Sequence, residues 1–389
     1  MRNRADHLVG RSQVFGRRRG MALVYVIVAM MAMVGFCSLA VDFGRVETAK
    51  TALRSTADAV AMYAVQGISD GTYVARAIQA GAENRVDGSP VVVQSGDVTL
   101  GTWTLPDGPF SAGGSSPNAI QVKLYRTKAR GTAIPLTFAA LVGQSSCNVT
   151  ATAIALFSQQ SATPYVSTLG NPWLSGEPTG TIGSETDAGY EGPDVNSEHP
   201  WQHDIAGPPG TKLASGQYYN SPVQVSVNVT SGSIITLTNV TGQGTNDPDN
   251  AMNTANGDDL TGNPSSDADD WVATGSPAEE HGISDVTMPH NAIVGVFLNN
   301  NLPDTDSAAQ PAALDFSTQT ERDYTVLSPQ LRQPFYAGNG QTSTGVQQQI
   351  VVPEGATRLF LGTMDGHEWS NNVGGYNATV TSTSISLVQ

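Results

Sequence analysis

The first strong pattern along the chain is an apolar run that continues into a helical stripe. From Met21 to Val41 lie 21 residues without a charged side chain. A helix of that length, at about 1.5 Å per residue, matches the roughly 30 Å hydrocarbon core of a bilayer. We expect one continuous helix from Met21 to about Gln66, because small and apolar residues then recur in steps of three and four: Val46, Ala49, Leu53, Ala57, Val60 and Ala64.

The apolar run has two interpretations, a cleaved signal sequence or a retained anchor. A signal peptide usually has an apolar core of about 7 to 15 residues and ends at a small-x-small site. Ser38-Leu39-Ala40 could serve as such a site. The longer run and the stripe that continues through Ala64 favour retention.

Basic residues before the run predict its orientation. By the positive-inside rule, residues 1–20 form a cytoplasmic tail, residues 21–41 cross the membrane, and the chain after Asp42 lies outside the cytoplasm. The arginines on which this rests are Arg2, Arg4, Arg11, Arg17, Arg18 and Arg19.

The remaining pattern predicts three further regions. Residues 42–158 combine the outer helix with a short helical pattern and period-two runs, which predicts a small α+β module. Residues 159–212 are rich in Gly and Pro without periodic apolar positions, which predicts a linker. Residues 213–389 read as short strands and predict a jelly-roll-like β-sandwich, interrupted by an acidic stretch at 243–270. The expected fold class is α+β with one transmembrane helix.

Charge and cysteine content limit the function classes. Residues 1–130 carry 15 Lys and Arg against 9 Asp and Glu, whereas residues 131–389 carry 4 against 25. The acidic part cannot neutralise phosphates, so we expect no nucleic-acid binding. Cys37 lies in the apolar run and Cys147 far beyond it, which argues against a disulfide framework.

Catalytic motifs give no support for an enzyme. The stretch "GISDG" at 67–71 matches G-x-S-x-G, but a nucleophile elbow needs a preceding strand and a helix is expected there. The sequence has no P-loop and no dinucleotide fingerprint. We therefore expect no enzymatic activity.

The N-terminal residues carry a family resemblance. "RRRG", the apolar run and "AVDFGRVETAKTALRSTADAVAMYA" resemble Flp-pilus assembly proteins of the TadE/TadG type, and residues 131–157 resemble the outer part of TadG-like proteins. This implies a membrane-anchored assembly or adhesion protein whose partners are the inner membrane and pilus or pseudopilin subunits. Pilin-like members are cut after a Gly and carry a Glu five residues on. Gly20 fits, but Tyr25 stands at the Glu position.

A second resemblance lies near the C-terminus. "VVPEGATRLFLGTMDGHEWSNNVGGYNATV" resembles LecA-like calcium-dependent galactose-binding lectins, which are small β-sandwiches. The resemblance implies that Asp365, Asn371 and Asn372 hold Ca²⁺, since calcium takes carboxylate and amide oxygens. These residues are also ordinary turn formers. Trp369 and His367 are candidate sugar contacts in the same loop.

Two functions therefore remain open. The first is a non-catalytic, membrane-anchored protein of Tad/Flp pilus assembly or envelope adhesion, whose helical stripe packs against equivalent helices or pilin subunits. The alternative is a membrane-tethered lectin that binds surface carbohydrate through calcium at residues 365–372.

Overall fold

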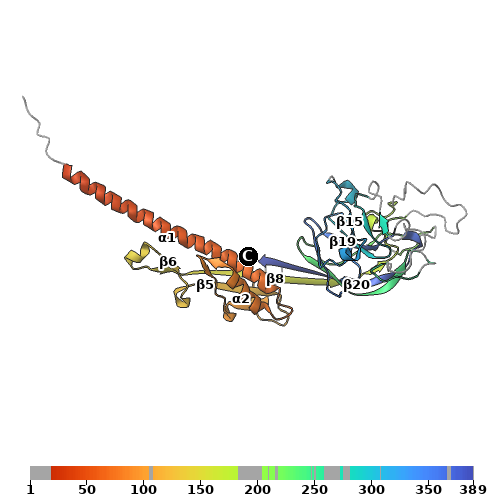
Figure 1. The fold of residues 1–389 in the computed structure, drawn as a ribbon, viewed down its shortest axis with the longest axis horizontal. Helices are drawn as coiled ribbons and strands as arrows, with labels where there is room; N and C mark the ends of the chain where they lie inside the picture. Colours follow the sequence, from red (N-terminus) through yellow and green to blue (C-terminus); the bar gives the residue numbers. More distant parts are fainter. Residues whose placement is uncertain are drawn as a thin grey trace, which may run out of the picture. The chain divides into compact units, whose positions relative to one another are not determined.

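The computed structural model forms two compact units, residues 1–156 with 386–389 and residues 157–385. The described residues are 19–104, 108–182, 204–208, 210–214, 218–246, 248, 251–257, 272–274, 281–306, 308–365 and 369–388. Figure 1 shows the course of the chain. Each unit has its own buried core.

The first unit is organised along one helix, α1 (Arg19–Val65). Its outer half buries Ala49, Leu53 and Ala57, whereas Leu23 to Val41 are exposed at nearly every position. From Ala22 onward α1 is long and apolar enough to cross a membrane. The predicted continuous helix is confirmed, and one helix combines a candidate span with a core stripe.

A short helix and a sheet complete the core of this unit. The helix α2 (Tyr73–Glu83) packs against α1 through Ala77 and Ala80. The antiparallel order is β4 (Ser111–Ala112), β3 (Val98–Thr102), β5 (Ala119–Arg126) and β8 (Val149–Ala162). From Ile120 onward, strand β5 alternates buried residues with partly buried or exposed ones, and it contacts α1. This alternation places the buried side chains of β5 on one face of the sheet, and α1 packs against that face.

Two small hairpins extend from this core. One joins β1 (Arg85–Val86) to β2 (Ser89–Pro90). The other joins β6 (Ile134–Pro135) to β7 (Ser146–Cys147), and its tip contains the 3-10 helix η3 (Ala139–Val142). The first unit also contains the 3-10 helices η1 (Ser95–Asp97) and η2 (Lys128–Arg130). The side chains of Arg130 and Asp97 form a bidentate ion pair.

The second unit is rich in strands. One antiparallel sheet has the order β10 (Val223–Gln224), β19 (Arg358–Thr363), β14 (Ile293–Leu298) and β17 (Phe335–Tyr336). Strand β14 is buried at all six residues, because both of its faces are covered. The mixed α+β class is confirmed.

A second set of strands in this unit has the order β16 (Val326–Leu327), β18 (Gln349–Val351), β11 (Ile234–Thr245) and β20 (Val373–Val388), and β9 (Tyr165–Ser167) pairs with β20. A smaller sheet contains β12 (Val272–Thr274), β13 (Val286–Pro289) and β15 (Leu314–Asp315). The jelly-roll arrangement stays a prediction. The short helical elements are η4 (Pro172–Leu174), η5 (Pro303–Thr305), α3 (Gln319–Arg322) and η6 (Trp369–Asn371).

Part of the predicted linker lies in this core. Val166 and Trp173 are almost fully buried, and the Trp173 indole nitrogen donates to the Ser284 carbonyl at 3.1 Å. The Gly- and Pro-rich composition concealed these contacts, because single large side chains between turns leave no periodic pattern. Residues 183–203 lie outside the described part, and the predicted domain boundaries stay predictions.

Candidate functional site

The end of the apolar run is fixed by one carboxylate. Asp42 is 3% exposed and accepts three backbone N–H groups of the β6–β7 hairpin tip. Its Oδ1 lies 2.8 Å from the Thr137 nitrogen, and its Oδ2 lies 2.9 Å from Phe138 and 2.6 Å from Ala139. The aspartate of "AVDFGR" therefore joins α1 to a segment more than ninety positions away.

Local geometry explains why the tip needs this partner. The first N–H groups of a helical turn have no acceptor within the turn. The residue before η3 is Phe138, whose side chain cannot accept a hydrogen bond, and Asp42 supplies the acceptor instead. The turn ends at Gly143, which adopts the left-handed conformation with φ 92°.

Opposing effects act on the charge of Asp42. Burial alone would raise the pKa of this carboxyl, but the amides of Ala139, Thr137 and Phe138 and the nearby charge of Arg45 lower it below its ordinary value. Hydrogen bonds that stabilise a carboxylate favour its ionised form. The group thus holds the tip as an anion.

The arginine of the same motif fixes the other hairpin. Nε and Nη2 of Arg45 each lie 3.0 Å from a carboxylate oxygen of Asp87. Asp87 and Gly88 form the β1–β2 turn with φ of 49° and 77°, the positive values that a tight hairpin needs. The Asp87 carboxylate raises the pKa of Arg45. Asp42 and Arg45 therefore position two hairpins at the base of the exposed helix.

An apolar groove lies between the hairpin tip and the exposed half of α1. The groove has a volume of about 800 Å³. Leu141 is 84% exposed and Phe138 is 36% exposed. The polar side chain at its wall, Ser38, donates its hydroxyl to the Val34 carbonyl of its own helix at 2.6 Å. Its apolar lining includes Ile27, Met31, Val34, Leu39, Phe138 and Leu141.

The predicted calcium residues occupy one loop of the second unit. Asp365 is 7% exposed and Asn372 is 5% exposed. The Asn372 side-chain nitrogen donates to the Thr168 carbonyl at 2.9 Å. The side-chain oxygens of Asn371 and Asn372 are buried, and neither accepts a hydrogen bond from any of the described residues. Two buried amide oxygens and a carboxylate in the same loop are the ligand types that calcium takes.

The candidate sugar contacts are placed differently. Trp369 is 5% exposed and donates its indole N–H to the Thr363 carbonyl at 2.8 Å. Its ring packs against that of Trp173, with the ring centroids 5.7 Å apart. Burial gives its rings a packing role, and the sugar-stacking role stays a prediction. His367 lies outside the described residues.

Sequence reasoning missed one neighbour of this loop. Asp204 is fully buried, and its Oδ2 accepts from the Trp369 backbone at 3.3 Å and from the Asn171 side chain at 3.0 Å. It stands in the segment interpreted as a linker. No sequence pattern signals its burial, because its partners are a side chain and a backbone amide that lie far from it along the chain.

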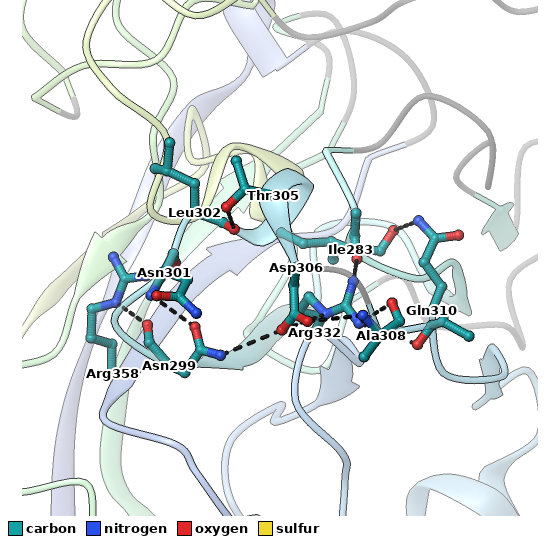
Figure 2. Close-up of polar contacts among 12 residues, drawn as sticks. Ile283, Asn299, Asn301, Leu302, Thr305, Asp306, Ala308, Gln310, Arg332 and Arg358 are labelled. Atoms are coloured by element: carbon teal, nitrogen blue, oxygen red, sulfur yellow. Dashed lines mark hydrogen bonds and ion pairs between the residues drawn. The ribbon is translucent and has the colours of Figure 1, made fainter.

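Two arginines organise the loops at another edge of this unit. Arg332 is 5% exposed, and its guanidinium donates to the carbonyls of Gly282, Ala308 and Ala309 (Figure 2). Arg358 donates to the carbonyls of Asn299 and Asn301, both at 2.7 Å. These contacts tie irregular backbone to the sheet, which indicates a structural role.

A third cluster offers metal-ligand chemistry. Donor atoms of Glu177, His281 and Asp304 lie within 4.8 Å of one another. Burial raises the pKa of Glu177, and the Asp304 charge adds to this effect while His281 and Arg358 oppose it. Asp304 is exposed, and His281 also contacts the Ile182 carbonyl at 3.3 Å. We therefore interpret the cluster as polar contacts at the surface and not as a metal site.

Comparisons with known proteins cover the first unit. Residues 20–67 match a family model described as putative Flp pilus-assembly TadE/G-like, and residues 47–155 match one described as putative Tad-like Flp pilus-assembly. Neither match reaches the second unit, and the lectin resemblance finds no support. No curated protein and no solved structure matches the chain. Over its long helix and first sheet, the chain is similar to proteins of Flp pilus assembly.

Proposed function

We propose that the chain is a single-pass protein of the inner membrane that works in Flp pilus assembly without catalysing a reaction. The N-terminus lies in the cytoplasm, residues 21–41 form the anchor, and the chain after Asp42 lies outside the cytoplasm. The observation that carries this proposal is the Asp42 contact. It fixes a folded module where the uncharged, exposed part of α1 ends. The two family matches support the assembly role.

The structure changes how such a protein would contact its partners. The outer stripe of Ala49, Leu53, Ala57, Val60 and Ala64 is buried within its own unit. It is therefore not available to pilin helices. Helical partners in the membrane, such as pilus or pseudopilin subunits, would instead contact the span on a face other than the groove.

Processing and fractionation test the anchor. We expect the membrane fraction to contain a chain whose N-terminal sequence begins at or before Met21 and which resists extraction by alkaline carbonate. A soluble product beginning at Val41 would overturn the proposal. Replacing residues 21–41 by an unrelated span tests whether the helix only anchors or also contacts partners, with surface pili as the readout.

We also propose, as a second function, that residues 365–372 bind calcium. This rests on the buried side-chain oxygens of Asn371 and Asn372 in the same loop as Asp365. A jelly-roll-like sandwich remains the proposed architecture of this region. A surface carbohydrate, bound by way of the metal, would be the lectin-like extension of this role.

Melting of the detergent-solubilised full chain tests the metal. Calcium should raise the melting temperature of the second unit, because a ligand that binds only the folded state stabilises it. Asn372→Ala should abolish the shift, while Asn377→Ala, at an exposed position of β20, should keep it. If the wild-type chain melts identically with calcium and with chelator, the site does not bind the metal.

A further inference from the structure

The tip of the β6–β7 hairpin stands beside the uncharged part of α1, residues 21–41, whose length matches a bilayer. We infer that this tip, residues 136–143, enters the outer leaflet next to α1, so that phospholipid acyl chains fill the groove between them. This inference rests on the proposed membrane anchoring. It adds a second, monotopic contact with the lipid to the single transmembrane helix.

The composition of the hairpin suits a lipid environment. Residues 131–157 contain no charged side chain. At the tip, Leu141 is 84% exposed and Phe138 is 36% exposed, although both are large apolar side chains. A contiguous exposed apolar patch marks an interaction surface. Here the patch continues directly from the exposed face of the span.

The position of the groove identifies its occupant. Its helical wall runs from Ile27 to Leu39, inside the uncharged run. Leu39 lies about 4.5 Å and Ile27 about 22 Å from Asp42 along the helix axis, at about 1.5 Å per residue. When residues 21–41 cross the membrane, this wall lies at the depth of the acyl chains. The groove between wall and tip then opens to hydrocarbon.

The backbone of the tip is prepared for that environment. A peptide group that enters hydrocarbon must have its hydrogen bonds satisfied within the protein. The N–H groups of Thr137, Phe138 and Ala139 bind the Asp42 carboxylate. Those of Leu141 and Gly143 bind carbonyls of the same turn at 3.0 and 3.1 Å. Asp42 thus anchors the tip and covers the polar groups that would otherwise oppose its insertion.

Residues at the stem of the tip follow the same rule. The Leu136 nitrogen donates to the Ser145 carbonyl at 3.0 Å, and the Gln144 nitrogen donates to the Ala139 carbonyl at 3.0 Å. Seven amides between Leu136 and Gln144 thus have acceptors within the protein.

Fluorescence quenching in vesicles tests the insertion. The full chain, with Cys37→Ser and Cys147→Ser, receives a single cysteine and an environment-sensitive dye at one of three positions. Leu141→Cys reports on the tip, Val34→Cys on the span, and Gln79→Cys on the exposed side of α2. In the vesicles of phosphatidylethanolamine and phosphatidylglycerol, a large share of the lipid is replaced by phosphatidylcholine with a nitroxide on its acyl chain.

The three positions separate the possible outcomes. We expect the labels at Leu141 and Val34 to lose most of their emission to the nitroxide lipid and the label at Gln79 to keep its emission. Quenching at Val34 without quenching at Leu141 overturns the insertion and leaves the anchor intact. A blue-shifted but unquenched label at Leu141 also overturns it, since a protein partner or second copy then fills the groove. No quenching at Val34 means that the anchor itself fails.

Discussion

The carboxylate of Asp42 lies 2.6 Å from the backbone nitrogen of Ala139, although 97 positions separate the two residues. The same carboxylate accepts from Thr137 and Phe138. One side chain in the "AVDFGR" motif thus decides where the hairpin tip stands relative to the apolar helix. The candidate span and the folded part of the first unit are coupled at this residue.

Replacing Asp42 by Asn should release the hairpin tip. The neutral amide is a weaker acceptor and one of its two heavy atoms can only donate, so the three N–H groups lose their shared partner. We expect amide exchange at Thr137 to Ala139 to become about tenfold faster or more, as a lost charged hydrogen bond implies. Hydrogen–deuterium exchange with mass spectrometry measures this. Asp58→Asn, the same change on the same helix, serves as control, and equal exchange in both variants would contradict the role of Asp42.

The same contact should weaken in acid. The folded state lowers the pKa of Asp42 below its ordinary value of 3.8, so the unfolded state binds the proton more tightly. Its stabilising contribution is therefore complete above about pH 4 and is lost as pH falls through the lower folded pKa. Exchange at the tip should accelerate below pH 3.8 in the wild-type chain, after correction for intrinsic rates, and Asp42→Asn should remove this dependence.

Sequence patterns predicted the parts of the fold that repeat. The helical stripe predicted α1 because each apolar position repeats at the spacing of one face, and period-two runs predicted strands such as β5 and β11. The Asp42 contact left no such signal. A single aspartate and three amides far along the chain meet only in the tertiary structure, and backbone N–H groups carry no residue type.

Prediction from the sequence was limited in the same way in the second unit. Trp173 and Asp204 lie in segments without periodicity, yet both are buried. Asp365, Asn371 and Asn372 could be named because they cluster in sequence. Asp204 could not be joined to them, because its link runs through the backbone of Trp369.

Arg332 should be essential to the stability of the second unit. Its planar guanidinium donates to carbonyls of Gly282, Ala308 and Ala309, a spread that a single lysine ammonium cannot reach (Figure 2). We expect Arg332→Lys to lower the free energy of unfolding of this unit by about 2 kcal/mol, since buried carbonyls lose charged donors. Chemical denaturation measures the change. Arg54→Lys, at an exposed position of α1, should leave stability unaltered, and a neutral Arg332→Lys would contradict the structural role.

Substitutions of Trp369 test whether this side chain packs in the core or binds sugar. It packs against Trp173 and donates to the Thr363 carbonyl. Trp369→Ala should cost about 3–5 kcal/mol of stability, the usual loss for truncating a buried aromatic side chain. Trp369→Phe should cost less because it keeps most of the volume. If thermal melting instead shows Trp369→Ala as stable as wild type, the side chain does not belong to the core and a surface role is favoured.

Asp285 should make the second unit less stable as pH rises, which is opposite to the effect of Asp42 in the first unit. Burial raises the pKa of this carboxyl to about 6, and its Oδ1 has no hydrogen-bond donor among the described residues. The folded state then binds the proton more tightly than the unfolded state. The contribution of Asp285 to stability is therefore greatest below the ordinary pKa of 3.8, falls as pH rises to about 6 and is level above it.

Replacing Asp285 by Asn should therefore stabilise the unit at neutral pH and change little near pH 4. We expect a gain of about 1 kcal/mol at pH 7, which allows for solvent screening of a partly exposed group. Melting temperatures between pH 4 and pH 8 measure it. Asp315→Asn is the matched comparison, because the Ser317 side chain and backbone lower the pKa of Asp315 and the same substitution should destabilise at neutral pH. Parallel pH profiles for wild type and Asp285→Asn would show that this carboxyl is ionised without cost in the folded chain.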